Sequence, residues 1–148
     1  MDDEGQDRRA HIRIGYMREV LEKELIAIAR MAMKNAYAPY SKLKVGAAVL
    51  YKSGHIFSGC NVENASYGLT ICAERSAILS AIANGERKFQ AIAITSTARN
   101  PIPPCGACRQ VMAEFTSDCD IVMVGSNRKI RKTKLKKLLP LAFTHKKV

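Results

Sequence analysis

Three cysteines and one glutamate at fixed spacings constrain the fold of this chain more than any other feature. Cys72 stands two residues before Glu74 in ICAERSA, and Cys105 and Cys108 lie three apart in PPCGACRQV. Thiols at this spacing can close on one metal ion, and the partial positive charge of a helix N-terminus favours the thiolate form that binds it. A fold that uses all three thiols together must bring residues 72 and 105–108 to one place.

The pattern of apolar residues predicts helices that alternate with strands. Apolar residues recur every three or four positions over about 16–36, which indicates an amphipathic helix. A hairpin is expected over 44–64, turning at Ser53-Gly54. A helix over 71–85, a buried strand over 89–97, a second helix over 105–116 and another buried strand over 120–126 follow. This order predicts an α/β layered sandwich in which both cysteine segments open helices at one end of the sheet.

The length and composition fit one domain spanning residues 1–148, with residues 1–12 expected to form a loose tail. With 148 residues and 47% hydrophobic composition, the chain can bury a core. No apolar run approaches the roughly 20 residues of a membrane helix, and the charged start has no signal-peptide core. A cytoplasmic location is therefore expected. Five cysteines without an export signal favour reduced thiols over disulfides, and Cys60 and Cys119 are interpreted as inert thiols.

Three thiolates that leave a fourth position open describe a catalytic zinc site, since a structural zinc is normally closed by four protein ligands. Glu74 would then supply proton transfer. The alternatives are small core cysteines, with Glu74 only a first-turn helix acid. A lone C-x-x-C also permits redox or structural-zinc roles, but neither these roles nor core packing explains the additional C-x-E.

The combination C-x-E followed by P-C-x-x-C fits the signature of zinc deaminases. Beyond it, four stretches resemble the small homotetrameric cytidine deaminases: YAPYSKLKVGAA (37–48), GCNVENASYGLTICAERSA (59–77), PCGACRQV (104–111) and LLPLAF (138–143). The resemblance spans roughly residues 16–143. It implies a three-layer α/β/α sandwich around a mixed sheet of about five strands, assembled as a homotetramer.

The resemblance also implies the chemistry. Cys72, Cys105 and Cys108 match the ligands of one Zn²⁺ per chain, and Glu74 matches the residue that carries protons between the water and the base. The expected reaction converts cytidine and deoxycytidine to uridine and deoxyuridine and releases ammonia. Arg75 matches a residue that donates hydrogen bonds to the cysteine sulfurs, although an exposed helix arginine is the simpler alternative.

Seven further positions match substrate-binding residues of that family. Asn61 and Glu63 match residues that hold ribose hydroxyls, and the backbone at Ala73 matches a contact to the base. Ala65, Tyr67 and Phe143 match residues that reach the nucleoside of a neighbouring subunit. Leu43 stands where many members have Phe against the pyrimidine, so this chain would lose aromatic stacking there. Each of these residues could instead serve only local packing or a turn.

The net charge of +11 raises the alternative of a nucleic-acid deaminase. Nine of the 24 Lys and Arg lie in residues 128–148, which contain no acid. The run RKIRKTKLKK (128–137) could be a phosphate-binding stripe but is more typical of a solvated helix face, and no aromatic residue interrupts it. The acidic Glu63, beside the expected ribose, fits a neutral nucleoside better than a phosphate. Another aminopyrimidine, such as a nucleoside antibiotic, and a non-catalytic zinc module remain as alternatives.

Overall fold

The computed structural model describes the backbone of residues 3–145 and the side chains of residues 18–145. Five strands form one sheet in the order β2-β1-β3-β4-β5, namely β1 (Val45–Tyr51), β2 (Ile56–Cys60), β3 (Phe89–Ser96), β4 (Asp120–Val124) and β5 (Ile130–Lys134). Only β3 and β4 run parallel, and the other neighbours are antiparallel. The helices are α1 (Asp3–Met33), α2 (Ala73–Ala83), α3 (Gly106–Phe115) and the short α4 (Leu135–Leu138), with a 3-10 turn at Tyr67–Leu69.

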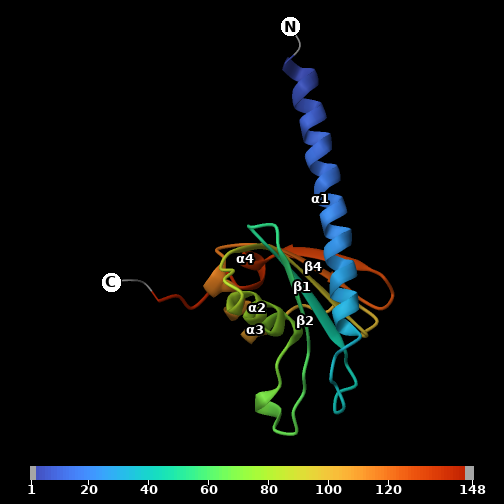
Figure 1. Ribbon diagram of the computed structural model, residues 1–148, viewed down its shortest axis with the longest axis vertical. Helices are drawn as coiled ribbons and strands as arrows, with labels where there is room; N and C mark the ends of the chain where they lie inside the picture. The colour runs from blue at the N-terminus through green and yellow to red at the C-terminus, as the bar shows by residue number, and fades with distance from the viewer. Residues whose placement is uncertain (1–2, 146–148) are drawn as a thin grey trace.

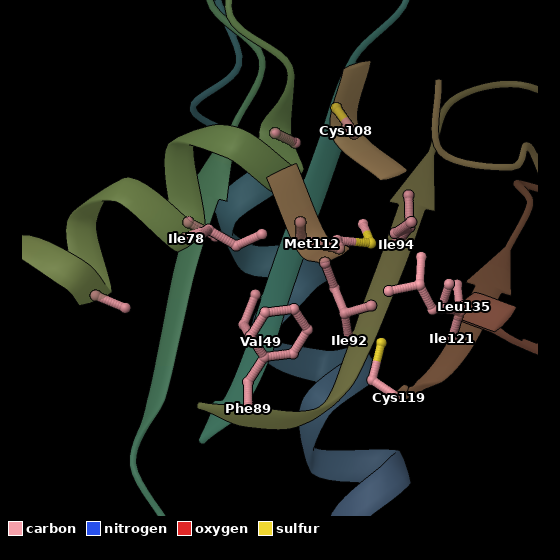
Figure 2. Packing of buried hydrophobic residues seen from close by; sticks show 14 of the residues in the cluster. Val49, Ile78, Phe89, Ile92, Ile94, Cys108, Met112, Cys119, Ile121 and Leu135 are labelled. Atoms are coloured by element: carbon pink, nitrogen blue, oxygen red, sulfur yellow. The ribbon is translucent and has the colours of Figure 1, made fainter. Parts of the chain in front are cut away.

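The sheet lies between two helical layers, as Figure 1 shows. Helix α1 packs on β1 and β3 from one side, whereas α2 packs on β1 and β2 from the other, beside α3. Side chains alternate accordingly along β1, with Val49 in the core below α2 and α3 and Leu50 in the core below α1. Figure 2 shows the larger core, where Ile78 of α2 and Met112 of α3 meet residues of the sheet. The predicted three-layer α/β/α sandwich is confirmed.

Two glycines let helices approach the sheet closely. A side chain at Gly46 of β1 would place its Cβ 2.0 Å from the carbonyl oxygen of Ala29 in α1. A side chain at Gly59 of β2 would place its Cβ 2.5 Å from the backbone nitrogen of Ala77 in α2. Because these neighbours are backbone atoms, only glycine fits, and the contacts fix where both helices cross the hairpin.

Helix α1 is longer than the sequence pattern predicts. It begins at Asp3 rather than near residue 16, so the expectation of a loose tail over residues 1–12 is wrong from Asp3 onward, and residues 1 and 2 lie outside the described part. Residues 3–15 contain no proline, and the helix continues through Gly5 and Gly15. In Figure 1 the first half of α1 projects beyond the sheet. No helix among the described residues is long and apolar enough to cross a membrane.

Half of the basic segment 128–137 is strand, which corrects the expectation of a solvated helix face. Residues Ile130–Lys134 pair with β4 as the edge strand, with Lys132 opposite Val122, and only Leu135–Leu138 are helical. Only Thr133 and Leu135 alternate with lysines in the manner of a strand, and lysines on an edge strand oppose pairing with another sheet. This segment supplies the fifth strand.

Candidate metal centre

The three predicted ligands converge where α2 and α3 begin. Cys72 is the N-cap of α2 and Cys105 the N-cap of α3, while Cys108 lies in the first turn of α3. Their sulfur atoms all lie within 4.8 Å of one another. The sulfur of Cys105 also accepts a hydrogen bond from the backbone nitrogen of Cys108, at 3.4 Å. Two helix N-termini thus direct their positive ends at one cluster of thiols.

The spacing of the sulfurs fits a tetrahedral zinc ion. Zinc–sulfur bonds of about 2.3 Å at tetrahedral angles place neighbouring sulfurs about 3.8 Å apart. The sulfurs of Cys72 and Cys105 lie 3.7 Å apart, and those of Cys105 and Cys108 lie 3.4 Å apart. Because only these three His, Cys, Asp or Glu side chains group here among the described residues, a fourth coordination position would stay open for water or substrate.

Arg75 lies against the thiol of Cys72. Its Nη2 donates to the sulfur of Cys72 at 3.5 Å and to the carbonyl oxygen of Thr70 at 3.4 Å. A hydrogen bond from the Cys108 thiol and the nearby guanidinium lower the pKa of Cys72 to about 5. The hydrogen bond with Cys72, followed by burial, raises the pKa of Cys108. These shifts favour the thiolate form at Cys72 and the protonated form at Cys108.

Glu74 is buried beside the cysteines in the first turn of α2, with only 5% of its surface exposed. Burial raises the pKa of its carboxyl from 4.5 to about 7. A carboxyl with this pKa can both accept and return a proton near neutral pH, which is what acid and base catalysis requires. Its burial and its interactions with the thiols of Cys72 and Cys108 distinguish it from an ordinary helix-capping acid.

Asn61 and Glu63 are also buried, and the loop before β1 holds both side chains. The amide of Asn61 accepts from the backbone nitrogen of Val45 and donates to the carbonyl oxygen of Leu43, each at 2.8 Å. The carboxylate of Glu63 accepts from the backbone nitrogen of Tyr40 at 2.9 Å and from the hydroxyl of Ser41. These hydrogen bonds, led by that of the Ser41 hydroxyl, lower the pKa of Glu63. A cavity of about 400 Å³ borders this carboxylate.

The remaining predicted residues fall into two groups. Ala73 is fully buried, and Leu43 packs against the core below α2 and α3. Ala65, by contrast, is exposed, and Tyr67 and Phe143 expose 74% and 79% of their surfaces. A single chain therefore assembles the thiols, Glu74 and Arg75, but leaves Phe143 largely exposed and places the Tyr67 ring edge-on against Tyr40, with ring centroids 5.8 Å apart.

Two residues with roles in the site were not singled out from the sequence. Ser41 and its backbone orient Glu63, and Gln110 of α3 binds the C-terminal segment. The Gln110 amide donates to the carbonyl oxygen of Phe143 at 2.7 Å and accepts from its backbone nitrogen at 3.2 Å. Both residues lie inside stretches that carry the resemblance, but their partners are 22 and 33 residues away, so no local pattern reveals the contacts.

Comparisons with known proteins agree with this geometry. Residues 20–126 match the family model described as the cytidine and deoxycytidylate deaminase zinc-binding region. A cytidine deaminase from Halalkalibacterium halodurans is 47% identical over 128 residues, covering 86% of this chain and 94% of the relative. The crystal structure of a cytidine deaminase from Burkholderia pseudomallei superposes with a TM-score of 0.78 at 50% identity, covering 82% of this chain and 98% of that one. A blasticidin-S deaminase from Bacillus cereus is less similar, at 33% identity over 132 residues, 82% of this chain and 91% of the relative.

Proposed function

Because this chain belongs to the cytidine and deoxycytidylate deaminase family, we propose that it hydrolyses cytidine and deoxycytidine to uridine and deoxyuridine and releases ammonia. The observation that carries the proposal is the convergence of three cysteine sulfurs within 4.8 Å, with the buried Glu74 in the adjacent helix turn. Held by the three cysteines, one zinc ion would supply a water of lowered pKa.

Glu74 would move the protons. In the ionised form it takes a proton from the attacking water, and in the protonated form it donates to the pyrimidine ring nitrogen and then to the departing amino group. Its pKa of about 7 supports both forms near neutral pH. Arg75, hydrogen-bonded to Cys72, would offset part of the negative charge of the thiolates.

The proposed substrate contacts come from Asn61 and Glu63, which follow β2 and whose side chains are held by the segment before β1. Glu63, kept ionised by its lowered pKa, accepts hydrogen bonds and suits ribose hydroxyls, but repels a phosphate placed beside it. Asn61 keeps one amide hydrogen and one oxygen lone pair beyond its two loop contacts. Leu43 and the backbone at Ala73 would border the base. These contacts support a free nucleoside rather than a polynucleotide.

We propose that the active species is a homotetramer. Tyr67, Ala65 and Phe143 are exposed in one chain, and the Gln110 amide fixes the backbone of Phe143 so that its ring extends outward. The exposed ring of Phe143, and the ring of Tyr67 that packs edge-on against Tyr40, suit the completion of a neighbour's pocket. Sedimentation should find a tetramer, and removal of residues 143–148 should lower activity more than zinc content. An active monomer would refute this assembly.

The proposed compartment is the cytoplasm, since all five cysteines are unpaired thiols. Two of them lie outside the metal cluster. Burial raises the pKa of Cys119 to about 12, so that thiol is chemically inert, as the sequence predicts. A reducing compartment keeps the three ligand thiols available for zinc.

The decisive experiment compares substrates. Cytidine and deoxycytidine should lose ammonia, measured by ultraviolet absorbance, while cytosine within a single-stranded oligonucleotide should not react. The similarity to the blasticidin-S deaminase makes blasticidin S the second candidate substrate, which should be measured in parallel. A kcat/KM for the oligonucleotide or the antibiotic above that for both nucleosides would overturn the proposed substrate class.

A further inference from the structure

A second hollow lies on the α1 side of the sheet, away from the cysteine cluster. It is open to solvent and has a volume of about 460 Å³, where α1 ends, where β3 ends and where β4 turns into β5. Its walls include Arg30 from α1, Thr97 after β3, and Ser126 and Arg128 from the turn. None of the three ligand cysteines, nor Glu74, contributes to it.

The polar groups in this hollow suit an anion. Two exposed arginines, together with Thr97 and Ser126, line a space whose lining contains no acidic residue. Within residues 18–145, neither Arg30 nor Arg128 forms an ion pair or a hydrogen bond through its side chain. Arginine presents a planar fork of donors that matches the oxygens of a phosphate, and two forks from different elements can hold one phosphate from two directions.

The walls of the hollow are joined by backbone hydrogen bonds. The backbone nitrogen of Ser126 donates to the carbonyl oxygen of Ala98 at 2.8 Å, and that of Thr97 donates to Lys44 at 3.0 Å. At Gly125, a Cβ would lie 2.4 Å from the carbonyl oxygen of Arg99, so the two loops are in direct backbone contact. The backbone walls are therefore preformed, and binding would order only the arginine side chains, which favours affinity for a small ligand.

Arg128 occupies a backbone conformation that glycine or asparagine would adopt at lower cost. Its φ is +63°, in the left-handed region, and it closes the β4–β5 turn through a hydrogen bond from its nitrogen to Gly125. The turn geometry alone therefore gives no reason for an arginine. An arginine at a strained backbone position suggests that its side chain has a functional role, such as binding a ligand.

We propose that this hollow binds a phosphate group, either free phosphate or the phosphate of a nucleotide, through Arg30 and Arg128. The neighbouring Lys129 and Arg131, both exposed, add positive potential that draws anions toward this end of the sheet. Glu63 disfavours phosphate at the nucleoside site, so the two sites would select different ligands. The inference stands apart from the proposed deaminase activity.

Calorimetric titration of the zinc-loaded, full-length protein with sodium phosphate and with AMP tests the proposal. Both variants Arg30→Gln and Arg128→Asn should weaken binding by about tenfold or more, since each removes a charged donor. Asparagine tolerates the positive φ at position 128. The matched control is Lys129→Gln, which removes one charge from the same turn but not from the lining, and should change the Kd by less than twofold.

The outcomes separate the possible ligands. Tighter binding of AMP than of phosphate assigns a nucleotide, and equal binding assigns free phosphate, provided that both depend on Arg128. Absence of saturable binding, an equal loss in Lys129→Gln, or salt-sensitive binding of an oligonucleotide alone would overturn the proposal in favour of a diffuse basic surface. Arg128→Gly relieves the backbone strain, so it should lose binding without losing thermal stability. Cytidine turnover of the variants tests the deaminase separately.

Discussion

Replacement of Glu74 by glutamine should abolish turnover and stabilise the fold at the same time. The substitution keeps the shape of a side chain that is 5% exposed but removes its ability to exchange a proton. We expect kcat to fall by about 10²–10⁴-fold, the usual contribution of a positioned acid or base. Zinc content should remain at about one per chain, because the three sulfurs are untouched.

The gain in stability follows from the raised pKa. The Glu74 carboxyl has a pKa of about 7 in the folded chain against the ordinary 4.5, so ionisation costs folding free energy as the pH rises above 4.5. At about 1.4 kcal/mol per pKa unit, the cost reaches roughly 3 kcal/mol above pH 7. Glutamine does not ionise, so the variant avoids this cost. Relative to native protein, the variant should gain stability at pH 8 and almost none at pH 4.5.

Thermal unfolding at the two pH values measures this effect. A gain of roughly 3 kcal/mol corresponds to a rise in Tm of about 6–12 °C for a chain of this size. The gain should be largest after chelation and smaller with zinc bound, because a nearby cation favours the ionised carboxylate. Glu114→Gln, on the exposed surface of α3, is the matched control and should alter neither activity nor Tm. Near-normal turnover, or the same stability change at both pH values, would refute this account of Glu74.

Three further substitutions test the metal cluster, its charge and the helix packing. Cys105→Ser should reduce bound zinc well below one per chain, measured by metal analysis, because it removes one of three sulfurs that lie within 4.8 Å; full zinc content would exclude this cysteine as a ligand. Arg75→Gln should keep zinc but move the rising limb of the pH–rate profile to higher pH, since the thiolates lose their cationic neighbour, and an unchanged profile would assign Arg75 no electrostatic role. Gly46→Ala should lower the free energy of unfolding by about 1–3 kcal/mol or more, measured in denaturant, because the added Cβ would meet the backbone of α1. The control Gly68→Ala, whose Cβ would meet nothing within 4 Å, should not lower it. Equal effects of the two substitutions would contradict the α1–β1 contact.

The sequence predicts the parts of this fold that repeat a local period. Helix α2, the β1–β2 hairpin at Gly54 and the buried β3 appear within a few residues of their expected limits, because each has strong apolar patterning and a turn signal. For the edge strand β5, the prediction of a helix is wrong. Its lysines conceal a weak alternation, and its strand conformation depends on pairing with β4, which no local pattern reports.

The candidate site likewise contains residues that the sequence predicts and contacts that it does not. The three cysteines and Glu74 occupy motif spacings, so their convergence can be predicted from the sequence alone. The hydrogen bonds of Ser41 to Glu63 and of Gln110 to Phe143 join residues 22 and 33 positions apart and depend on the tertiary fold. The hollow beside Arg128 likewise requires α1, β3 and the β4–β5 turn to meet, and the sequence indicates only that the segment is basic.

Because two ligand cysteines are helix caps, only some segments of this chain can vary in length. Cys72 and Cys105 each stand at the boundary where extended backbone becomes helix, so the ligand geometry is set by the start of each helix. One residue inserted between Cys105 and Cys108 would rotate the second sulfur by about 100° around the axis of α3. Insertions between Gly85 and Phe89, in the turn before β3, would leave both helix starts unchanged. Length variation among relatives should therefore gather in such turns and be absent within C-x-E and C-x-x-C.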